Sequence, residues 1–248
     1  MVDSMNYKYI ALVPAYKPDE TLKSVVGDLK KYGFIVIVVD DGSGSEYKKY
    51  LDVGTDKVIS YENNMGKGYA LKTGFKYIKE NYNNYIVVNV DCDGQHKADD
   101  AYKLCEYVKD NPDTLVIGKR LRKNNVPIRS KIGNAITRFI FFIVTLRHIY
   151  DTQSGLRAFS ESLMDYMINI SGNRFEYEMN VLLNLNKNHI KHKEIEIKTI
   201  YINNNRGSHF KVFRDSFRIY KQIVKFRIKE IVLFLILIIL IIILVKKS

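Results

Sequence analysis

Along the first 120 residues, short segments that are apolar throughout alternate with longer segments whose apolar residues recur every three or four positions. The apolar segments are YIALVPAY, FIVIVVD, KVIS, YIVVNVD and LVIGKR. A glycine turn, NNMGKG, leads into a helical pattern that runs to Glu80, and a second helical pattern runs from Ala98 to Asp110. Strands that are apolar on both faces are typical of parallel sheets covered by helices on both sides. The pattern therefore predicts an α/β domain with a mostly parallel sheet.

The C-terminal region has a different pattern. Residues Ile231 to Val245 are unbroken hydrocarbon and are followed by Lys246 and Lys247. A helix of this length rises about 22 Å, short of the roughly 30 Å hydrocarbon core of a bilayer, but flanking lysine and arginine side chains can extend the span by reaching the interface. A buried core helix is the alternative. Because the segment has no polar face, we expect residues 231–248 to be a membrane anchor.

The segment before this anchor is amphipathic. Aromatic and apolar residues recur at helical spacing, and basic residues recur on a neighbouring face: Phe213, Phe217, Tyr220 and Val224, and Arg214, Arg218, Lys221 and Lys225. This pattern favours a helix lying at a membrane surface, although a helix packed on the soluble domain would show it too. We therefore divide the chain into a domain at 1–211, an amphipathic helix at 212–230 and the anchor at 231–248.

Charge and cysteine content narrow the setting. The net charge is +12, which suits nucleic acid, an anionic membrane or a phosphorylated substrate. Cys92 and Cys105 give no disulfide framework, and the N-terminus lacks the pattern of a signal peptide. Basic residues before Ile231 favour the cytoplasmic side for the domain, although Lys246 and Lys247 lie on the other flank. We expect a cytoplasmic catalytic domain with a single C-terminal anchor.

Polar or special residues stand where three apolar segments end. They are Pro14, Ala15 and Tyr16, then Asp40 and Asp41, then Asp91 and Asp93. Ligands of open parallel sheets bind at the carboxyl ends of the strands, so three such ends together favour a binding site over three unrelated turns. Two carboxylates with one residue between them suit a divalent cation such as Mg²⁺ or Mn²⁺, and Gln95 could add an amide oxygen.

The motifs VPAYKPDE, VVDDGSGS, NMGKGYALKTGF, DCDGQH, GKR and DTQSGLRAF follow one another as in family-2 glycosyltransferases. Within that family the chain most resembles dolichol-phosphate mannose synthases and bacterial polyprenyl-phosphate glycosyltransferases, over about residues 7–210. The resemblance implies a GT-A fold, a Rossmann-like nucleotide half followed by an acceptor half. It also implies inverting, metal-dependent transfer of a sugar from a UDP- or GDP-linked donor to a polyprenyl phosphate at the membrane. A membrane-protein partner or a homo-oligomer is open.

The resemblance assigns residues to the donor side. Asp40 would contact the base, Asp41 the ribose or the loop backbone, and Asp91 the nucleotide as well as the metal. Lys67, within Gly66-Lys67-Gly68, would meet the nucleotide, although a plain glycine turn explains this sequence too. Pro14, Ala15 and Tyr16 would form a wall beneath the base, with Tyr16 alternatively in the core. Arg206 would reach the diphosphate, but its register departs from the R-x-x-G-x-S-K pattern of the mannose synthases.

The acceptor side follows the GKR motif. Arg120, Arg129 and Lys131 could hold the phosphate of a lipid phosphate, arginine with two parallel hydrogen bonds. In the family, the DTQSGLRAF motif lines the sugar or acceptor end through Asp151, Gln153, Ser154 and Arg157. The apolar segment ITRFIFFIVTLRH is too short to cross a bilayer and would either border the lipid entrance or lie in the core.

We expect a lipid-phosphate acceptor, and a sugar hydroxyl acceptor is the alternative. A lipid phosphate is already anionic and needs no general base, so Asp91, Asp93 and Arg120 would carry the chemistry. A sugar hydroxyl acceptor, in polysaccharide or glycolipid synthesis, would need a base, for which Glu176 or Glu178 in FEYEM is the candidate, Glu176 first. A non-catalytic binder of membranes or nucleic acid is a third reading. It leaves Asp91 and Asp93 unexplained, and no RNA-binding motif is present, so we expect no nucleic acid partner.

Overall fold

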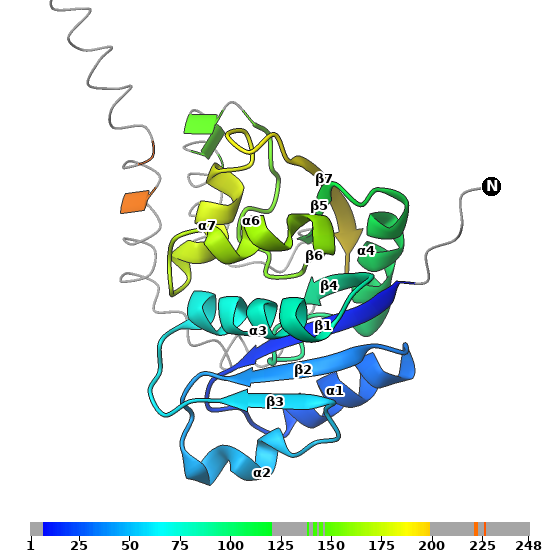
Figure 1. The fold of residues 1–248 in the computed structure, drawn as a ribbon, viewed down its shortest axis with the longest axis vertical. Helices are drawn as coiled ribbons and strands as arrows, with labels where there is room; N and C mark the ends of the chain where they lie inside the picture. The colour runs from blue at the N-terminus through cyan, green and yellow to red at the C-terminus, as the bar shows by residue number, and fades with distance from the viewer. Residues whose placement is uncertain are drawn as a thin grey trace, which may run out of the picture.

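A computed structural model describes residues 7–120 and 147–198, together with single residues of helical segments at 138, 141, 142, 144, 145, 221, 222 and 226. In these parts a seven-stranded sheet has the order β3-β2-β1-β4-β6-β5-β7 (Figure 1). The strands are β1 (Lys8–Ala15), β2 (Ile35–Asp40), β3 (Lys57–Ser60), β4 (Tyr85–Asn89), β5 (Thr114–Arg120), β6 (Arg157–Ser160) and β7 (Lys191–Ile197).

Helices and short turns connect the strands. They are α1 (Thr21–Lys31), α2 (Lys48–Leu51), α3 (Lys67–Asn81), α4 (Ala98–Asp110), α6 (Met164–Asn169) and α7 (Glu176–Leu183), with single 3₁₀ turns at Ser45–Tyr47 and Glu161–Leu163. Strands β1 to β4 are mutually parallel, and β5 is parallel to β7. Strand β6 runs antiparallel to both β4 and β5, so the sheet is mixed but mostly parallel.

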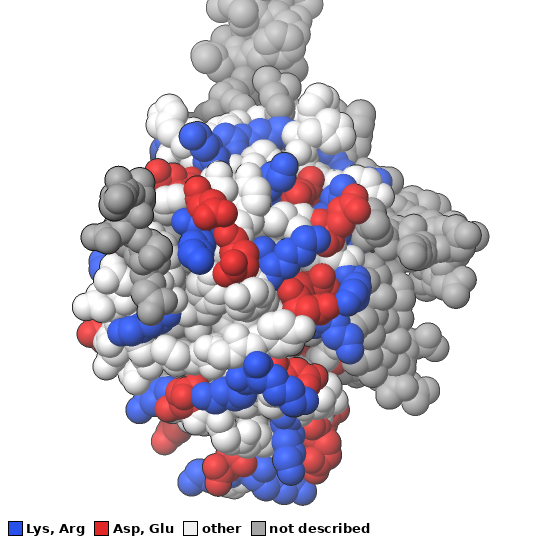
Figure 2. Space-filling model, turned by 90° about the vertical axis from the view of Figure 1, so that its right-hand side faces the viewer, with Lys and Arg blue, Asp and Glu red and all other residues white. Residues whose placement is uncertain are grey.

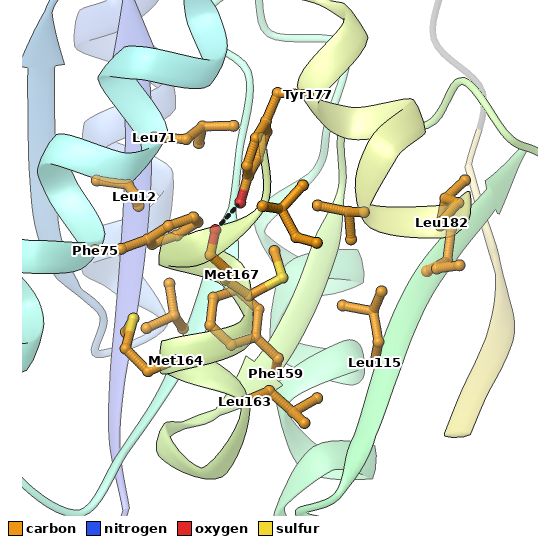
Figure 3. Packing of buried hydrophobic residues seen from close by; sticks show 14 of the residues in the cluster. Leu12, Leu71, Phe75, Leu115, Phe159, Leu163, Met164, Met167, Tyr177 and Leu182 are labelled. Atoms are coloured by element: carbon orange, nitrogen blue, oxygen red, sulfur yellow. Dashed lines mark hydrogen bonds between the residues drawn. The ribbon is translucent and has the colours of Figure 1, made fainter. Parts of the chain in front are cut away.

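The sheet separates two apolar layers because alternate side chains of a strand point to opposite faces. Ile10 and Leu12 of β1 join the layer formed with α3, α6 and α7, whereas Ala11 and Val13 join the layer formed with α1 and α4. In the first layer Phe75 of α3 meets Phe159 of β6 edge to face, and the Tyr177 hydroxyl donates to the Met167 carbonyl at 2.6 Å (Figure 3). These contacts hold α3 against β6 and α7 against α6 on one face of the sheet.

The predicted architecture is confirmed in its main features. The five apolar segments form β1 to β5, the helix expected to end near Glu80 is α3, and the helix expected from Ala98 to Asp110 has those bounds. The sheet is mostly parallel with helices on both faces, as expected (Figure 1). The antiparallel strand β6 departs from the parallel pattern.

The membrane segments are largely outside the described residues. The anchor expected at 231–248 lies wholly outside them, and within the described parts no helix is long and apolar enough to span a bilayer. Of the amphipathic segment, Lys221 is exposed and Phe226 is half-buried against the layer that contains α3 and α7. In the apolar segment 136–148, Phe141 is buried in that same layer and Phe142 is exposed. The division at residue 212 stays a prediction.

Charge is mixed on the side of the molecule seen in Figure 2, which lies to the right in Figure 1. Lys and Arg side chains are interspersed there with Asp and Glu side chains (Figure 2). The net charge of +12 therefore does not form a uniformly basic surface on this side.

Candidate active site

A buried ion-pair cluster lies where α3 begins, beside the end of β4. The Lys67 ammonium is 2.7 Å from Asp91 Oδ1 and 3.0 Å from Glu178 Oε1 of α7. The Lys67 and Glu178 side chains are only 15% and 14% exposed, and Asp91 is 28% exposed. Residues from β4, α3 and α7, far apart in the chain, thus meet at one charged point.

The charges of this cluster hold one another ionised. Burial alone would lower the pKa of Lys67, but the Asp91 and Glu178 carboxylates outweigh it and raise that pKa. Burial would likewise raise the pKa of Asp91, but the Lys67 charge outweighs it and lowers the pKa to about 2. Lys67 is therefore an ammonium and Asp91 a carboxylate at neutral pH.

Asp93 stands in a different environment two residues further on. Its carboxylate accepts from the Gln95 backbone N–H at 3.0 Å and from the Gln95 side-chain amide at 2.9 Å. Burial and the neighbouring Asp91 charge raise the pKa of Asp93. Between the two, burial raises the pKa of the Cys92 thiol to about 12, so Cys92 is a neutral side chain here. Gln95, expected as a metal ligand, donates to Asp93 and orients its carboxylate.

Asp91 is enclosed on its other side by Gly155 and His96. A Cβ atom at Gly155 would lie 2.7 Å from Asp91 Oδ2 and 2.9 Å from the Lys67 ammonium, so only glycine fits without displacing these groups. The Asp91 backbone N–H donates to His96 Nδ1 at 3.2 Å. Burial lowers the pKa of His96 to about 4, in keeping with a neutral ring that accepts this bond.

Asp41 organises the loop that leads to Lys67. Its carboxylate accepts from the Tyr61 hydroxyl at 2.8 Å, from the Asn64 side-chain amide at 2.8 Å and from two backbone N–H groups, those of Met65 at 2.8 Å and Gly66 at 2.9 Å. Of the two roles expected for Asp41, the loop-backbone contact is the one present here. The glycine turn thus carries Lys67 to Asp91 on a loop fixed by an aspartate.

The other residues expected on the donor side lie at the ends of β1 and β2. Asp40 is buried and accepts from the Ser43 backbone N–H at 3.0 Å. Ser43 in turn accepts from the Lys17 backbone N–H at 2.7 Å, which joins the two strand ends. Pro14 and Ala15 are buried, whereas Tyr16 is half-buried with the Lys17 ammonium over its ring. Tyr16 is therefore accessible at this edge of the sheet.

Arg120 is the last residue of β5, and its guanidinium donates two hydrogen bonds to the Asp151 carboxylate. Its Nε lies 2.7 Å from Asp151 Oδ2 and its NH2 3.0 Å from Asp151 Oδ1. Asp151 is buried, and Glu194 of β7 holds its backbone N–H at 2.9 Å. Burial would raise the pKa of Asp151, but its bonds to Arg120 lower it. The Nε and NH2 groups of Arg120, which was expected to bind a phosphate, thus bind the Asp151 carboxylate.

The rest of the DTQSGLRAF motif is mostly buried. Gln153 is exposed, but Ser154 and Arg157 are 0% and 1% exposed and cannot line an open surface. The Arg157 guanidinium donates to the Ser154 carbonyl at 3.0 Å and to the Glu178 carbonyl at 2.7 Å. Arg157 thereby ties α7 to the loop before β6 and holds Glu178 next to Lys67.

The two candidate general bases are separated by their position on α7. Glu178 faces Lys67, whereas the Glu176 carboxylate accepts from the backbone N–H groups of Asn173 and Arg174, each at 3.2 Å. The structure thus puts Glu178 in the charged cluster and Glu176 at the start of the helix.

Some of the predicted site residues lie outside the described part of the chain, and some residues found at the site were not predicted. Arg129, Lys131 and Arg206 lie outside the described residues. Gly155, Glu194 and Arg174, which donates to Asn64 Oδ1 at 3.0 Å, were not singled out. Gly155 alone had a sequence signal, as the glycine of the motif DTQSGLRAF.

Comparison with known proteins gives the family. A family model described as Glycosyl transferase family 2 matches residues 11–171, more than half of the chain. The chain belongs to glycosyl transferase family 2. This family-2 chain is therefore a glycosyltransferase that uses a nucleotide-sugar donor.

Two relatives of this family-2 chain are similar over most of its length. A UDP-N-acetylglucosamine–dolichyl-phosphate N-acetylglucosaminyltransferase of Methanococcus voltae is 32% identical over 81% of this chain and 88% of its own. A dolichyl-phosphate beta-glucosyltransferase of Saccharomyces cerevisiae is 24% identical over 87% of this chain and 73% of its own. The region aligned with the first relative is long enough to include both halves of the domain.

Solved structures support the GT-A-like fold of this family-2 chain. A mycobacterial protein has a TM-score of 0.72 at 16% identity, over 90% of this chain and 76% of its own. GalNAc-T7 with UDP, GalNAc and Mn²⁺ has a TM-score of 0.52 at 14% identity, over 88% of this chain and 48% of its own. At these identities the likeness shows the fold alone.

Proposed function

We propose that this glycosyltransferase moves a sugar from a nucleoside-diphosphate donor to a polyprenyl phosphate at the cytoplasmic face of a membrane. The two relatives support this acceptor, because both names contain dolichyl phosphate while the sugars differ. Because the two relatives are named for different sugars, their names do not identify the sugar that this chain transfers. A UDP-linked donor is named for one relative, and a UDP- or GDP-linked donor suits this chain.

The donor side has the ligands that a metal-bound diphosphate needs. Among the described residues, no group of three or more His, Cys, Asp or Glu side chains is placed to hold a metal. Mg²⁺ and Mn²⁺ at phosphate sites need only one or two protein carboxylates, because phosphate oxygens and water complete the shell. Asp91 and Asp93 fit that requirement, with Asp93 oriented by Gln95. A divalent cation bound there would stabilise the charge that develops on the departing diphosphate.

The distribution of basic residues supports an anionic acceptor near a membrane. Residues 121–137 contain four Lys and Arg and no Asp or Glu, and residues 199–248 contain ten and two. These two segments account for the whole net charge of +12, so the rest of the chain is electrically balanced. The first segment begins directly after Arg120, at the carboxyl edge of the sheet, and the second contains the expected membrane segments.

The observation that carries the choice of acceptor is the ion pair between Glu178 and Lys67. Of the two candidate bases, Glu178 is the one in the charged cluster, and its carboxylate is already 3.0 Å from an ammonium group. A carboxylate used in this way is a counterion and is poorly disposed to remove a proton. A lipid phosphate needs no such base, because its oxygen is already anionic and can attack the anomeric carbon directly. Attack opposite the departing diphosphate inverts the anomeric configuration.

Arg120 is proposed to receive the acceptor phosphate. Asp151 holds its guanidinium at the end of β5, and Glu194 holds Asp151, so the arginine is oriented before the lipid arrives. Preorganised donors of this kind cost little reorganisation when an anion binds. Arg129 and Lys131, from the basic segment, are proposed to contribute to the same site.

The acceptor class is tested by comparing Glu178→Gln, Glu176→Gln and Arg120→Ala for initial rates of transfer to polyprenyl phosphate. We expect Glu178→Gln to keep turnover within about tenfold, whereas loss of a general base costs on the order of 10² to 10⁴. Arg120→Ala should raise the KM for the lipid. Glu176→Gln is the matched control on the same helix, since the Glu176 carboxylate accepts from the backbone of Asn173 and Arg174, and the ion pairs described for Lys67 are those with Asp91 and Glu178. A Glu178→Gln enzyme slowed a thousandfold, with Arg120→Ala unaffected, would contradict the proposal and favour a hydroxyl acceptor.

A further inference from the structure

Lys67 already binds Oδ1, one of the two oxygens that the Asp91 carboxylate has to offer a metal. Its ammonium lies 2.7 Å from Asp91 Oδ1, a contact as short as a strong charge-assisted hydrogen bond. The other oxygen, Oδ2, faces Gly155, where an added Cβ would approach within 2.7 Å, and the buried His96, whose Nδ1 is 3.9 Å away. Both carboxylate oxygens of Asp91 thus lie close to other groups of the protein, and the group beside Oδ1 is the Lys67 ammonium.

We propose that Lys67 guards the metal site, which means that it keeps a free divalent cation from binding there. The Lys67 ammonium and the cation compete for the Asp91 carboxylate. The metal therefore binds only together with the donor diphosphate, whose oxygens replace Asp91 as partners of Lys67. The inference rests on the proposed function only in taking Asp91 as a metal ligand. It does not depend on which sugar or which acceptor is used.

The charges in the cluster explain why the metal alone is disfavoured. Two cations, Lys67 and Arg157, stand with the carboxylates of Asp91 and Glu178 and largely compensate them, and Asp93 adds one further carboxyl group two residues from Asp91. A divalent cation added alone would leave the site with an excess of positive charge, even with Asp93 ionised, in a partly buried place, which is costly. A diphosphate arriving with the metal brings negative charge of its own. Its oxygens can bind the Lys67 ammonium as that group leaves Asp91.

Glu178 keeps Lys67 within reach during this exchange. Its carboxylate is the second partner of the ammonium at 3.0 Å, and Arg157 fixes its backbone carbonyl at 2.7 Å. When Asp91 turns to the metal, Lys67 retains one carboxylate partner and stays beside the site. Glu178 is therefore a positioning residue that acts through Lys67.

The test measures binding of Mn²⁺ alone to the full-length protein in detergent, by electron paramagnetic resonance, without nucleotide or lipid. We expect Lys67→Met to bind Mn²⁺ at least about tenfold more tightly than the wild type, because an adjacent cation shifts carboxylate equilibria by one to three powers of ten. Lys72→Met is the matched control. It removes the same charge from the same helix, where Lys72 contacts only Asn173 Oδ1 at 2.9 Å among the hydrogen bonds described, and it should bind like the wild type.

Two further variants keep the outcome decisive. Glu178→Gln should bind Mn²⁺ more weakly than the wild type, because Lys67 then has Asp91 as its main partner. Asp91→Asn should lose binding in every background. Thermal unfolding with and without Mn²⁺ shows whether each variant folds, and added Mn²⁺ should raise the midpoint most for Lys67→Met.

These outcomes separate the guard from the metal site itself. If Asp91→Asn binds Mn²⁺ as the wild type does, the proposed metal ligand is wrong. If Asp91→Asn loses binding but Lys67→Met binds no more tightly than Lys72→Met, the guard is overturned while the metal site stands. Tighter binding by Glu178→Gln would also overturn the guard.

Discussion

Gly155 shows how narrowly single residues set this site. The space that its missing Cβ would fill is bordered by the Asp91 carboxylate and the Lys67 ammonium. Because both are ends of flexible side chains, a methyl group would displace them without forcing the backbone apart. A substitution at Gly155 should therefore disturb the chemistry more than the fold.

We predict that Gly155→Ala lowers turnover by a factor on the order of 10², since small misplacements of reacting groups cost that much. Its unfolding midpoint should change little. Steady-state rates and calorimetry on the same samples check both expectations. Gly27→Ala is the control, because Gly27 lies in α1 with open space around it, and alanine there should add about 0.5–1 kcal/mol of stability without changing the rate. Wild-type turnover in Gly155→Ala would contradict the described packing.

Asp41 is a residue whose effect should fall on stability. Its buried carboxylate accepts four hydrogen bonds from the loop before Lys67, and an asparagine would turn an amide donor toward some of those donors. We predict that Asp41→Asn lowers the free energy of unfolding by about 1–3 kcal/mol, measured by urea denaturation. Asp28→Asn removes an exposed carboxylate paired with Lys31 and should stay within about 0.5 kcal/mol of wild type. Equal stability of the two variants would show that Asp41 does not organise the loop.

At the scale of elements, tyrosine hydroxyls join α6 and α7, those of Tyr166 and Tyr177, and the hydrogen bond of Tyr177 is the fully buried one. Tyr177 is 1% exposed, and its hydroxyl donates to the Met167 carbonyl (Figure 3). Removing it leaves a buried carbonyl without that partner, so Tyr177→Phe should lower the free energy of unfolding by about 1–2 kcal/mol. Tyr102→Phe, at a 36% exposed tyrosine of α4, should be nearly neutral. Denaturant titration of both proteins makes the comparison, and a neutral Tyr177→Phe would be contrary to this account.

Elements buried on both faces could be predicted from the sequence, and others could not. Strands β1, β2 and β4 are continuous apolar segments, because both sides of each meet an apolar layer. Strand β6 has four residues and begins with Arg157, and β7, KHKEIEI, begins with four polar residues at the sheet edge. Neither has an apolar run, so neither was predicted.

The same division holds for the site. The sequence indicated Asp91, Asp93 and Lys67, because each lies at the end of a strand or in a glycine turn with a local signal. The sequence could not predict that Glu178, and not Glu176, lies beside Lys67, since that depends on how α7 is rotated against α3. Nor could it predict that Asp151 binds the edge of Arg120 expected for a phosphate. Such contacts between distant residues are set by packing and leave no pattern in the local sequence.

At the scale of the whole molecule, residues 1–120 and 138–198 are together electrically balanced, and the excess positive charge lies in residues 121–137 and 199–248. Residues 199–230 contain eight Lys and Arg and two Asp and Glu, ahead of the hydrocarbon of Ile231 to Val245. We predict that removing residues 231–248 releases much of the protein from membranes and leaves a residual attachment that high salt removes. Sedimentation of vesicles at low and high salt measures this. If the truncated protein sediments in high salt as fully as the intact one, the anchor lies elsewhere.

The central claim is that the acceptor is a polyprenyl phosphate, and a matched pair of acceptors tests it most directly. Full-length protein in vesicles is given UDP- and GDP-linked sugars with either a polyprenyl phosphate or the polyprenol of the same chain length, and the lipid products are weighed by mass spectrometry. The account predicts one added sugar on the polyprenyl phosphate, from one of the donors, and none on the polyprenol, since only the phosphate supplies an anionic nucleophile without a base. Transfer to the polyprenol at a comparable rate, or to a sugar hydroxyl in place of the lipid phosphate, would contradict it.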